Sequence, residues 1–319
     1  MRTPRTTLAL AGLLAWLPVL GATLAAQEAL PDGGSSSPAP DAAGRSAEVR
    51  ATALMLLAFI SDGSTPTRGP HRVPVRRGFQ WFAAAQQPNG AIGTATSLHD
   101  HALATWAFAS GVAAGCEVLA PRAARAIEYL ELHGQPGAPG FDLELAAWRC
   151  LVRRALLSVD PRPEPLAMFD EARFQVLRLW LDTRETPALA ATSALDIAAE
   201  LTVRTELDRE GAAADPRVAA LRAALLALDP SFDDPERALD PRATLLATWS
   251  LYVLGGPEWD RWRRGLDGFA RAPRDAAPGA PIFDLPPPAW RRESDRVSAG
   301  ALAEITLTIY YRYSRLLHP

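Results

Sequence analysis

The chain carries two helix-like segments in a row, RRGFQWFAAAQQPNGAIG at residues 76–93 and HDHALATWAFA at residues 99–109. Apolar residues in both segments recur at helical spacing, and the Pro-Asn-Gly sequence at 88–90 is a strong turn signal. The stretch therefore predicts a helix, a turn and a second helix. Weaker versions of this pair recur along the chain, which indicates a repeated unit.

An alternation of apolar and more charged helices extends over most of the chain. Apolar helices are predicted to begin near residues 48, 99, 142, 190, 240 and 297, about 50 residues apart, a period typical of repeated supersecondary units. Helices that are apolar on nearly all sides must be covered, and amphipathic helices between them supply the cover. No segment has the alternation of a strand. The economical arrangement is all-α, an (α/α)6 toroid with six inner helices and about five to six outer ones.

Residues 77–92 resemble the repeat of the squalene–hopene cyclase and protein prenyltransferase superfamily. That repeat runs basic, Gly, two residues, aromatic, large apolar, three residues, Gln, three residues, Gly, one residue, Trp. The corresponding residues of this chain are Arg77, Gly78, Trp81, Phe82, Gln86 and Gly90. The chain departs from the pattern at Ile92, where the family has a stacking tryptophan. The resemblance implies an α/α toroid over residues 47–317, in which the aromatic packs inward, the Gln caps a helix end and the Gly permits the turn.

The N-terminal region predicts export. Residues 1–26 combine two early arginines, an apolar run and small residues at the end, which is the pattern of a signal peptide; an uncleaved anchor is the alternative. Residues 27–46 are rich in Pro, Gly and Ser and predict a disordered linker. The folded domain is then residues 47–319, in the periplasm, the cell envelope or outside the cell. No stable membrane span is expected once the signal is cleaved.

The basic residues exclude several classes of function. All 33 are arginine, and without lysine neither a Walker-type phosphate loop nor a Schiff-base enzyme is expected. The net charge is −3 and the arginines are scattered among acids, which argues against a nucleic-acid partner. Cys116 and Cys150 are the only cysteines, and both a disulfide and two buried thiols remain open.

The catalytic motifs of the resembling family are absent from this chain. The nearest match to the Asp-x-Asp-Asp acid of the cyclases is 231–234, where a serine replaces the first aspartate. The prenyltransferase zinc site requires an aspartate two residues before a cysteine, and neither cysteine has one. Gly115-Cys116-Glu117 is only a fragment of the thioester motif of related rings. We therefore expect no metal and no cofactor.

His99-Asp100-His101 is the most suggestive polar cluster. In an extended chain the two imidazoles would point the same way and could bind a metal ion, whereas in a helix they lie about 200° apart and cannot share one. The structural alternative is that Ser97 or Asp100 caps the following helix and the imidazoles form hydrogen bonds at the rim. The three residues are candidates for ligand binding.

Carboxylates on the inner helices are the candidate catalytic residues. Asp196 and Glu200 stand four apart and share a helix face, and paired carboxylates serve as acid and base in glycoside hydrolysis. Glu304 is a third candidate, and Glu144 and Trp106 are candidates for ligand binding in the lumen or at the rim. The structural alternatives are pairing with arginine for the acids and core packing for the tryptophan.

These patterns favour an exported binding or interaction module without a catalytic motif. The expected partner is a protein or an apolar small molecule, held in the lumen or at the rim where six helix N-termini gather positive dipole ends. The alternative is an enzyme acting on an isoprenoid, as a terpenoid cyclase does, or on a carbohydrate through lumen carboxylates. An enzyme needs convergent acids of raised pKa. Asp196, Glu200 and Glu304 each paired with arginine would exclude it.

Overall fold

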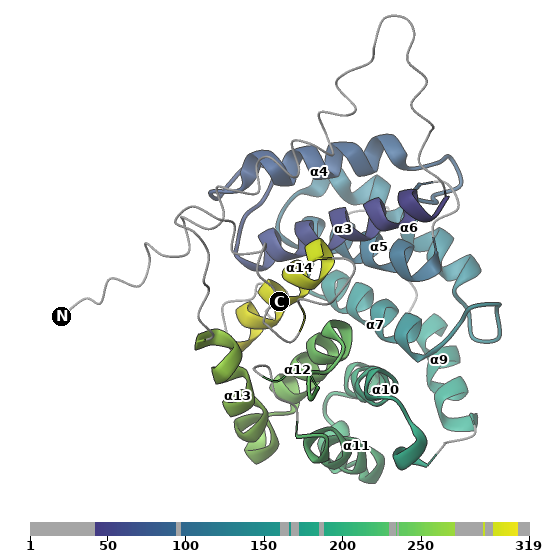
Figure 1. The fold of residues 1–319 in the computed structure, drawn as a ribbon. Coiled ribbons are helices and arrows are strands. Elements are labelled where there is room, and N and C mark those ends of the chain that lie inside the picture. The colour runs from purple at the N-terminus through teal and green to yellow at the C-terminus, as the bar shows by residue number, and fades with distance from the viewer. Residues whose placement is uncertain are drawn as a thin grey trace, which may run out of the picture.

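The computed structural model describes residues 42–93, 97–159, 166, 172–184, 188–229, 234, 236–271, 290 and 296–311. This part of the chain folds into eleven α-helices with short 3-10 turns and contains no strand, only an isolated bridge between Gln86 and Ile92 (Figure 1). The all-α prediction is confirmed. The predicted signal peptide, residues 1–26, lies outside the described residues, as does most of the predicted linker.

Six helices form a cyclic series of contacts. Their bounds are α3 (Ala42–Ser61), α5 (Leu98–Ala113), α7 (Leu143–Leu157), α10 (Ala194–Leu207), α12 (Pro241–Leu254) and α14 (Arg296–Tyr310). Each packs against the next, and α14 packs against α3. Between the last pair, the Thr308 hydroxyl donates a hydrogen bond to Ser61 Oγ at 3.1 Å. This cyclic order is compatible with a six-membered α/α ring.

Five further helices lie outside these six (Figure 1). They are α4 (Arg72–Ala85), α6 (Ala120–His133), α9 (Ala172–Thr183), α11 (Pro216–Ala227) and α13 (Gly256–Arg271). The 3-10 turns are η2 (Glu117–Leu119), η3 (Leu189–Ala191) and η4 (Ala212–Ala214). Outer helices pack on the inner helices that precede them, as α4 does on α3, α6 on α5, α11 on α10 and α13 on α12.

The inner helices are apolar on most sides because neighbouring inner helices and an outer helix pack against them. In α5 every residue from Asp100 to Val112 is buried. The outer helix α13 is buried along one side only, where Trp259 and Trp262 face the ring, and the Trp262 indole N–H donates to Thr248 Oγ1 of α12 at 2.9 Å. A wide apolar surface in the sequence therefore marks an inner helix, and a narrow apolar stripe marks an outer one.

The residues of the repeat motif join neighbouring helices. Gly78 lets α4 approach α3, because a Cβ at this position would lie 2.8 Å from Leu56 Cδ2. Phe82 is fully buried. Gln86, the residue that follows α4, donates its side-chain amide to the Arg122 carbonyl of α6 at 2.9 Å. The motif thus ties the turn after α4 to the start of the next outer helix.

Gly90 is the motif position with the strictest steric demand. Its φ of +94° belongs to the region that favours glycine, and a Cβ would lie 2.1 Å from the Arg125 carbonyl oxygen of α6. The backbone of the turn therefore passes directly against the backbone of α6. Ile92 is fully buried beside this contact. Trp81 is partly buried, and Arg77 is exposed.

Three features bear on the remaining predictions from sequence. Helix α3 begins at Ala42, so residues 42–46 of the predicted linker are helical; two alanines and the lack of proline after Pro40 let the helix extend backward. Cys116 and Cys150 are both free thiols. No helix in the described ranges is both long and apolar enough to cross a membrane.

Candidate functional site

A cavity of about 360 Å³ lies at the end of the ring where inner helices begin. Residues of α3, α5, α7, α12 and α14 line it, and we call it the rim pocket. Its size falls within the range of small-molecule sites. Its charged or ionisable lining consists of Arg50, His99, Asp100, Asp142, Glu144, Asp240 and Arg242.

Capping residues bring polar side chains to this rim. Asp142 accepts a hydrogen bond from a backbone N–H of α7 at 2.8 Å, and Asp240 accepts one from α12 at 2.7 Å. Ser97 caps α5 in the same way, at 3.1 Å. A cap stands at the start of its helix, so first-turn side chains such as Glu144 and Arg242 lie on the same rim.

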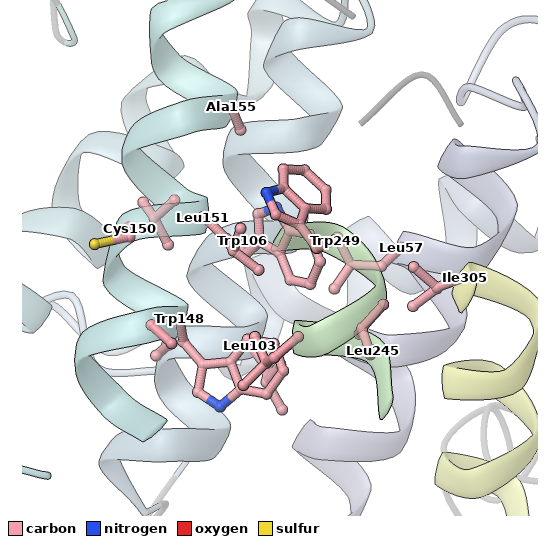
Figure 2. Close-up of a cluster of buried hydrophobic side chains, with 14 of the residues drawn as sticks. Leu57, Leu103, Trp106, Trp148, Cys150, Leu151, Ala155, Leu245, Trp249 and Ile305 are labelled. Carbon is pink, nitrogen blue, oxygen red and sulfur yellow. The ribbon is translucent and has the colours of Figure 1, made fainter. Parts of the chain in front are cut away.

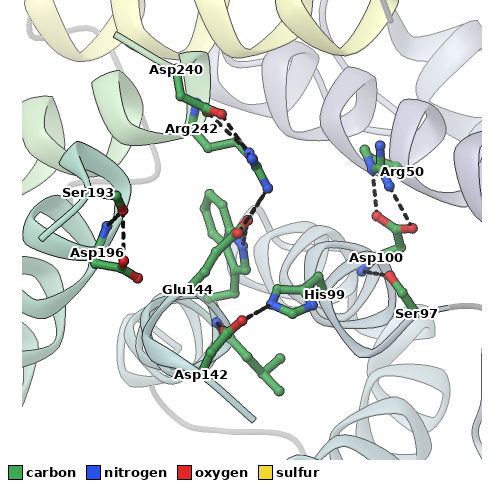
Figure 3. Close-up of polar contacts among 12 residues, drawn as sticks. Arg50, Ser97, His99, Asp100, Asp142, Glu144, Ser193, Asp196, Asp240 and Arg242 are labelled. Carbon is green, nitrogen blue, oxygen red and sulfur yellow. Dashed lines mark hydrogen bonds and ion pairs between the residues drawn. The ribbon is translucent and has the colours of Figure 1, made fainter. Parts of the chain in front are cut away.

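Arg242 crosses the pocket from α12 to α7 (Figure 3). Its Nη1 donates to both carboxylate oxygens of Glu144, at 3.1 and 2.9 Å, and its Nη2 donates to Asp240 at 2.9 Å. The Trp148 indole N–H donates to Glu144 as well, at 3.1 Å. Glu144 is buried, and these donors satisfy its charge. The arrangement fixes one wall of the pocket.

Asp100 is paired with α3 on the opposite wall. Its side chain is 1% exposed and accepts hydrogen bonds from Arg50 Nε at 2.6 Å and Nη2 at 3.2 Å. The Ser46 hydroxyl donates to the same carboxylate at 2.5 Å. These donors satisfy the oxygens of this buried carboxylate without a ligand. Its position in the pocket wall agrees with the sequence, but its contacts are those of a structural residue.

His99 faces Asp142 between the starts of α5 and α7 (Figure 3). The imidazole Nε2 lies 3.0 and 3.1 Å from the two Asp142 oxygens. This hydrogen bond raises the pKa of His99, and the charges of Asp142, Glu144 and Asp100 add to it against the opposing effect of burial. Burial alone would raise the pKa of Asp142, but the bonds from His99 and from the backbone outweigh it and lower that pKa. An imidazolium–carboxylate pair at the mouth of the pocket is favoured.

His101 points away from the pocket, as the helical alternative requires. It is 1% exposed; its Nε2 lies 3.0 Å from the Ala126 carbonyl, and its Nδ1 accepts a bond from the Ile92 N–H at 3.4 Å. Burial lowers the pKa of His101 to about 4. The neutral ring therefore joins α5 to α6 and to the repeat turn, and the two histidines do not share a ligand.

The candidate catalytic carboxylates do not converge on the pocket. Glu200 is 2% exposed and bonds to Arg204 at 3.0 Å and to Arg217 of α11 at 2.9 Å. Burial raises the pKa of Glu200, but the two guanidinium groups outweigh this effect and lower it. Asp196 accepts a bond from the Ser193 hydroxyl at 2.7 Å in a capping arrangement (Figure 3). Glu304 is partly buried on α14.

Trp106 belongs to the packed centre of the ring. Its ring stacks on Trp148 at a centroid distance of 5.9 Å and meets Trp249 edge-on at 6.2 Å. All three side chains are at most 1% exposed. Figure 2 shows Leu57 of α3, Leu245 of α12 and Ile305 of α14 in the same cluster. Side chains thus fill the middle of the ring below the rim pocket.

Sequence reasoning anticipated His99, Asp100 and Glu144 at the rim but missed their partners. Arg50 stands 50 residues from Asp100, and Arg242 stands 98 residues from Glu144. The sequence does contain a signal for one of them, since Arg242 lies at the helix start predicted near residue 240 and follows Asp240, a residue type that caps helices. Its partner depends on the register between α7 and α12, which local spacing does not encode.

Neither a metal centre nor a known relative identifies the site. Across the part of the chain that the structure describes, no group of three or more His, Cys, Asp or Glu side chains is placed to hold a metal ion. No protein-family model, characterised protein or solved structure matches the chain.

Proposed function

We propose that this protein is a binding module that holds a small polar molecule in the rim pocket. The observation that carries the proposal is the combination of a 360 Å³ cavity lined by paired charges with a ring centre filled by tryptophan. Small-molecule sites are concave and place a few polar groups against an apolar floor. Here Leu54, Leu103 and Leu302 supply the floor.

A polar ligand fits this geometry better than an apolar one. An isoprenoid would need an enclosed apolar lumen, and the tryptophan cluster occupies that space. In the rim pocket an apolar ligand would cover charged groups, such as Arg242 and Asp142, without replacing their contacts with water, which is costly. The side chains of these two residues are 42% and 52% exposed and so reach both the pocket and water.

The proposed class is an exported, divergent and non-catalytic member of the α/α-toroid proteins related to terpenoid cyclases. The cyclic order of the inner helices and the contacts of Gln86 and Gly90 support the relation to these proteins. Export rests on the charged start, the apolar run and the small residues at 1–26. Expression of the full chain in a bacterium, followed by cell fractionation and N-terminal sequencing, tests export, and an intact residue 1 in the cytosolic fraction would refute it.

A ligand screen tests the binding proposal. The mature chain, residues 27–319, is examined by thermal shift against a library of small polar metabolites, and hits are confirmed by calorimetry. Organic extraction followed by mass spectrometry provides the opposing measurement, because a co-purified polyprenyl lipid would contradict a polar site.

Two matched variants locate the binding. Glu144→Gln changes a buried, arginine-bonded carboxylate in the pocket, and Glu200→Gln changes a similar one outside it. We expect E144Q to weaken the hit at least about tenfold, since a hydrogen bond to a charged group is worth 1.5–3 kcal/mol. E200Q should leave the affinity unchanged while lowering the melting temperature. Equal affinities in the two variants would place the ligand elsewhere.

An enzyme is the second candidate, and His99 is the observation that favours it. A histidine of raised pKa that is held by a carboxylate at a pocket mouth has the chemistry of a general acid. Against it, the pKa of Asp142 and of Glu200 is lowered, whereas a carboxylic acid catalyst needs a raised one. Incubation of each hit with protein, followed by product analysis, separates the two functions. Turnover that disappears in His99→Gln would establish the enzyme.

A further inference from the structure

The side chains that line the rim pocket carry more negative than positive charge. Four carboxylates and two guanidinium groups line it, which leaves two net negative charges while His99 is neutral and one when it is protonated. Arg50 is bonded to Asp100, and Arg242 is bonded to both Glu144 and Asp240. The excess charge therefore belongs to the α7 and α12 starts, where Asp142 and Asp240 act as caps.

The helix N-termini at this rim carry the opposite sign. First-turn or capping residues of α5, α7, α12 and α14 line the pocket, so four N-terminal ends meet there. Each end is equivalent to roughly half a positive charge, which gives roughly two positive charges in total. With His99 neutral the helix ends offset the excess of carboxylates, and with His99 protonated the pocket carries roughly one positive charge, so its net charge stays small.

A neutral pocket of paired charges disfavours a charged ligand. An ion entering it would lose hydration, and every opposite charge within reach is already held by a partner of the protein. Metal ions and phosphates would need ligands that these pairs do not release. What the pocket offers instead is hydrogen bonding, with carboxylate oxygens that accept and guanidinium and imidazole groups that donate.

We infer that the rim pocket binds an uncharged, hydroxyl-rich compound such as a mono- or disaccharide or a cyclitol. This inference rests on the proposed function, and it names the ligand class. Each hydroxyl both donates and accepts, so it bonds to a carboxylate on one side and to an arginine on the other without breaking the pairs. The leucine side chains of the floor contact the C–H faces of such a ring. The cavity volume of about 360 Å³ suits one or two sugar rings.

Calorimetry with matched probes tests the ligand class. The neutral probes are D-glucose, trehalose, maltose, cellobiose, myo-inositol and sorbitol. The charged counterparts are D-glucuronate and gluconate as anions and N-methylglucamine as the cation, all at one fixed pH and at low salt. We expect at least one neutral probe to bind and its charged counterparts to bind at least tenfold more weakly. E144Q should weaken the binding at least about tenfold, and E200Q should leave it unchanged.

The outcomes separate this inference from the proposed function. A charged probe that binds as tightly as its neutral counterpart, with E144Q weakening it, overturns the ligand class and keeps the pocket as a binding site. If no neutral probe binds but the metabolite screen yields a hit of another class, the ligand class is likewise overturned and the pocket remains a binding site. A neutral probe that binds E144Q and wild type equally overturns both statements.

A second pair of variants tests the charge balance directly. Asp142→Asn and Asp215→Asn each remove one negative charge from a helix cap, and asparagine still caps the helix. Only Asp142 lines the rim pocket; Asp215 caps the outer helix α11. At a pH high enough that His99 is neutral in both proteins, we expect D142N to improve glucuronate binding relative to glucose by roughly fivefold, because a unit charge in a half-exposed site acts at short range. D215N should leave the ratio unchanged. An unchanged ratio in D142N overturns the charge argument.

Discussion

Substitution of the repeat glycine, Gly90→Ala, probes the contact between the turn after α4 and the backbone of α6. A Cβ at Gly90 would lie 2.1 Å from the Arg125 carbonyl oxygen, whereas real Cβ contacts stay above 3.0 Å. The turn and α6 must therefore separate by nearly 1 Å. Because the obstacle is backbone and not a flexible side chain, no rotamer change relieves it.

The expected cost has two parts. An L-residue at positive φ costs roughly 1–2 kcal/mol. Overpacking against a fixed backbone adds about 1–3 kcal/mol. Gly137→Ala is the matched control, because Gly137 has a φ of +89° but nothing within 4 Å of the added Cβ. It should carry only the first part. We therefore expect G90A to lose about 2–5 kcal/mol of unfolding free energy and G137A about 1–2 kcal/mol.

Urea unfolding followed by circular dichroism measures both variants. The slope with denaturant should stay constant, so that the midpoint reports stability alone. Equal losses in G90A and G137A would refute the reasoning, because they would show that the Arg125 contact adds nothing to the dihedral strain. A urea unfolding curve for G90A that splits into two transitions would instead place α6 outside the cooperative unit.

Three further predictions concern buried and titrating groups. The pKa of His101 falls to about 4 on burial, so the unfolded chain binds a proton before the folded one as the pH drops below about 6.5, and the wild-type free energy of unfolding should fall by roughly 3 kcal/mol between pH 7 and pH 4. Urea unfolding of His101→Gln should lack this pH dependence, and an equal pH dependence in the two proteins would contradict the prediction. His99 has the opposite sign: its raised pKa stabilises the fold below the unfolded value near 6.5, and the advantage over His99→Gln should vanish as the pH rises through the folded pKa. A gap between the two proteins that widens with pH would refute this. Arg149, 1% exposed and bonded to Glu131 at 2.8 Å, should cost about 3–5 kcal/mol when changed to leucine alone; the double variant R149L/E131L should recover part of that loss, and no recovery would show that the buried charge is not its source.

The helical architecture could be predicted because it depends on local pattern. The width of the apolar surface separated the inner helices from the outer ones, and the starts predicted near 99, 142 and 240 lie within one residue of α5, α7 and α12. The cap Ser97 was visible because a capping bond joins residues only a few positions apart. The start of α3 was predicted late, because alanine-rich sequence next to a Pro-rich segment gives no sharp boundary.

The candidate site was only partly predictable, and the reason is geometric. Spacing placed Asp196 and Glu200 on one helix face, but it did not reveal that Ser193 binds the first and that Arg217 of the outer helix binds the second. The Ser193 contact is a local cap, whereas the Arg217 contact depends on how α10 is rotated between its neighbours. The relation between Glu144 and Arg242 likewise arises across the ring.

The bond between Ser61 and Thr308 also has a consequence for biosynthesis. The two residues are 247 positions apart, so a ribosome working at roughly 5–20 residues per second needs about 12–50 s to travel from one to the other. During that interval α14 has not been synthesised, so the surfaces of α3 and α12 that α14 covers in the folded protein remain exposed. Until α14 emerges from the ribosome, the nascent chain therefore exposes apolar surface that can aggregate. We expect chaperones to bind the nascent chain during this interval. A chain that ends before residue 296 lacks α14 and would leave the apolar surfaces of α3 and α12 uncovered.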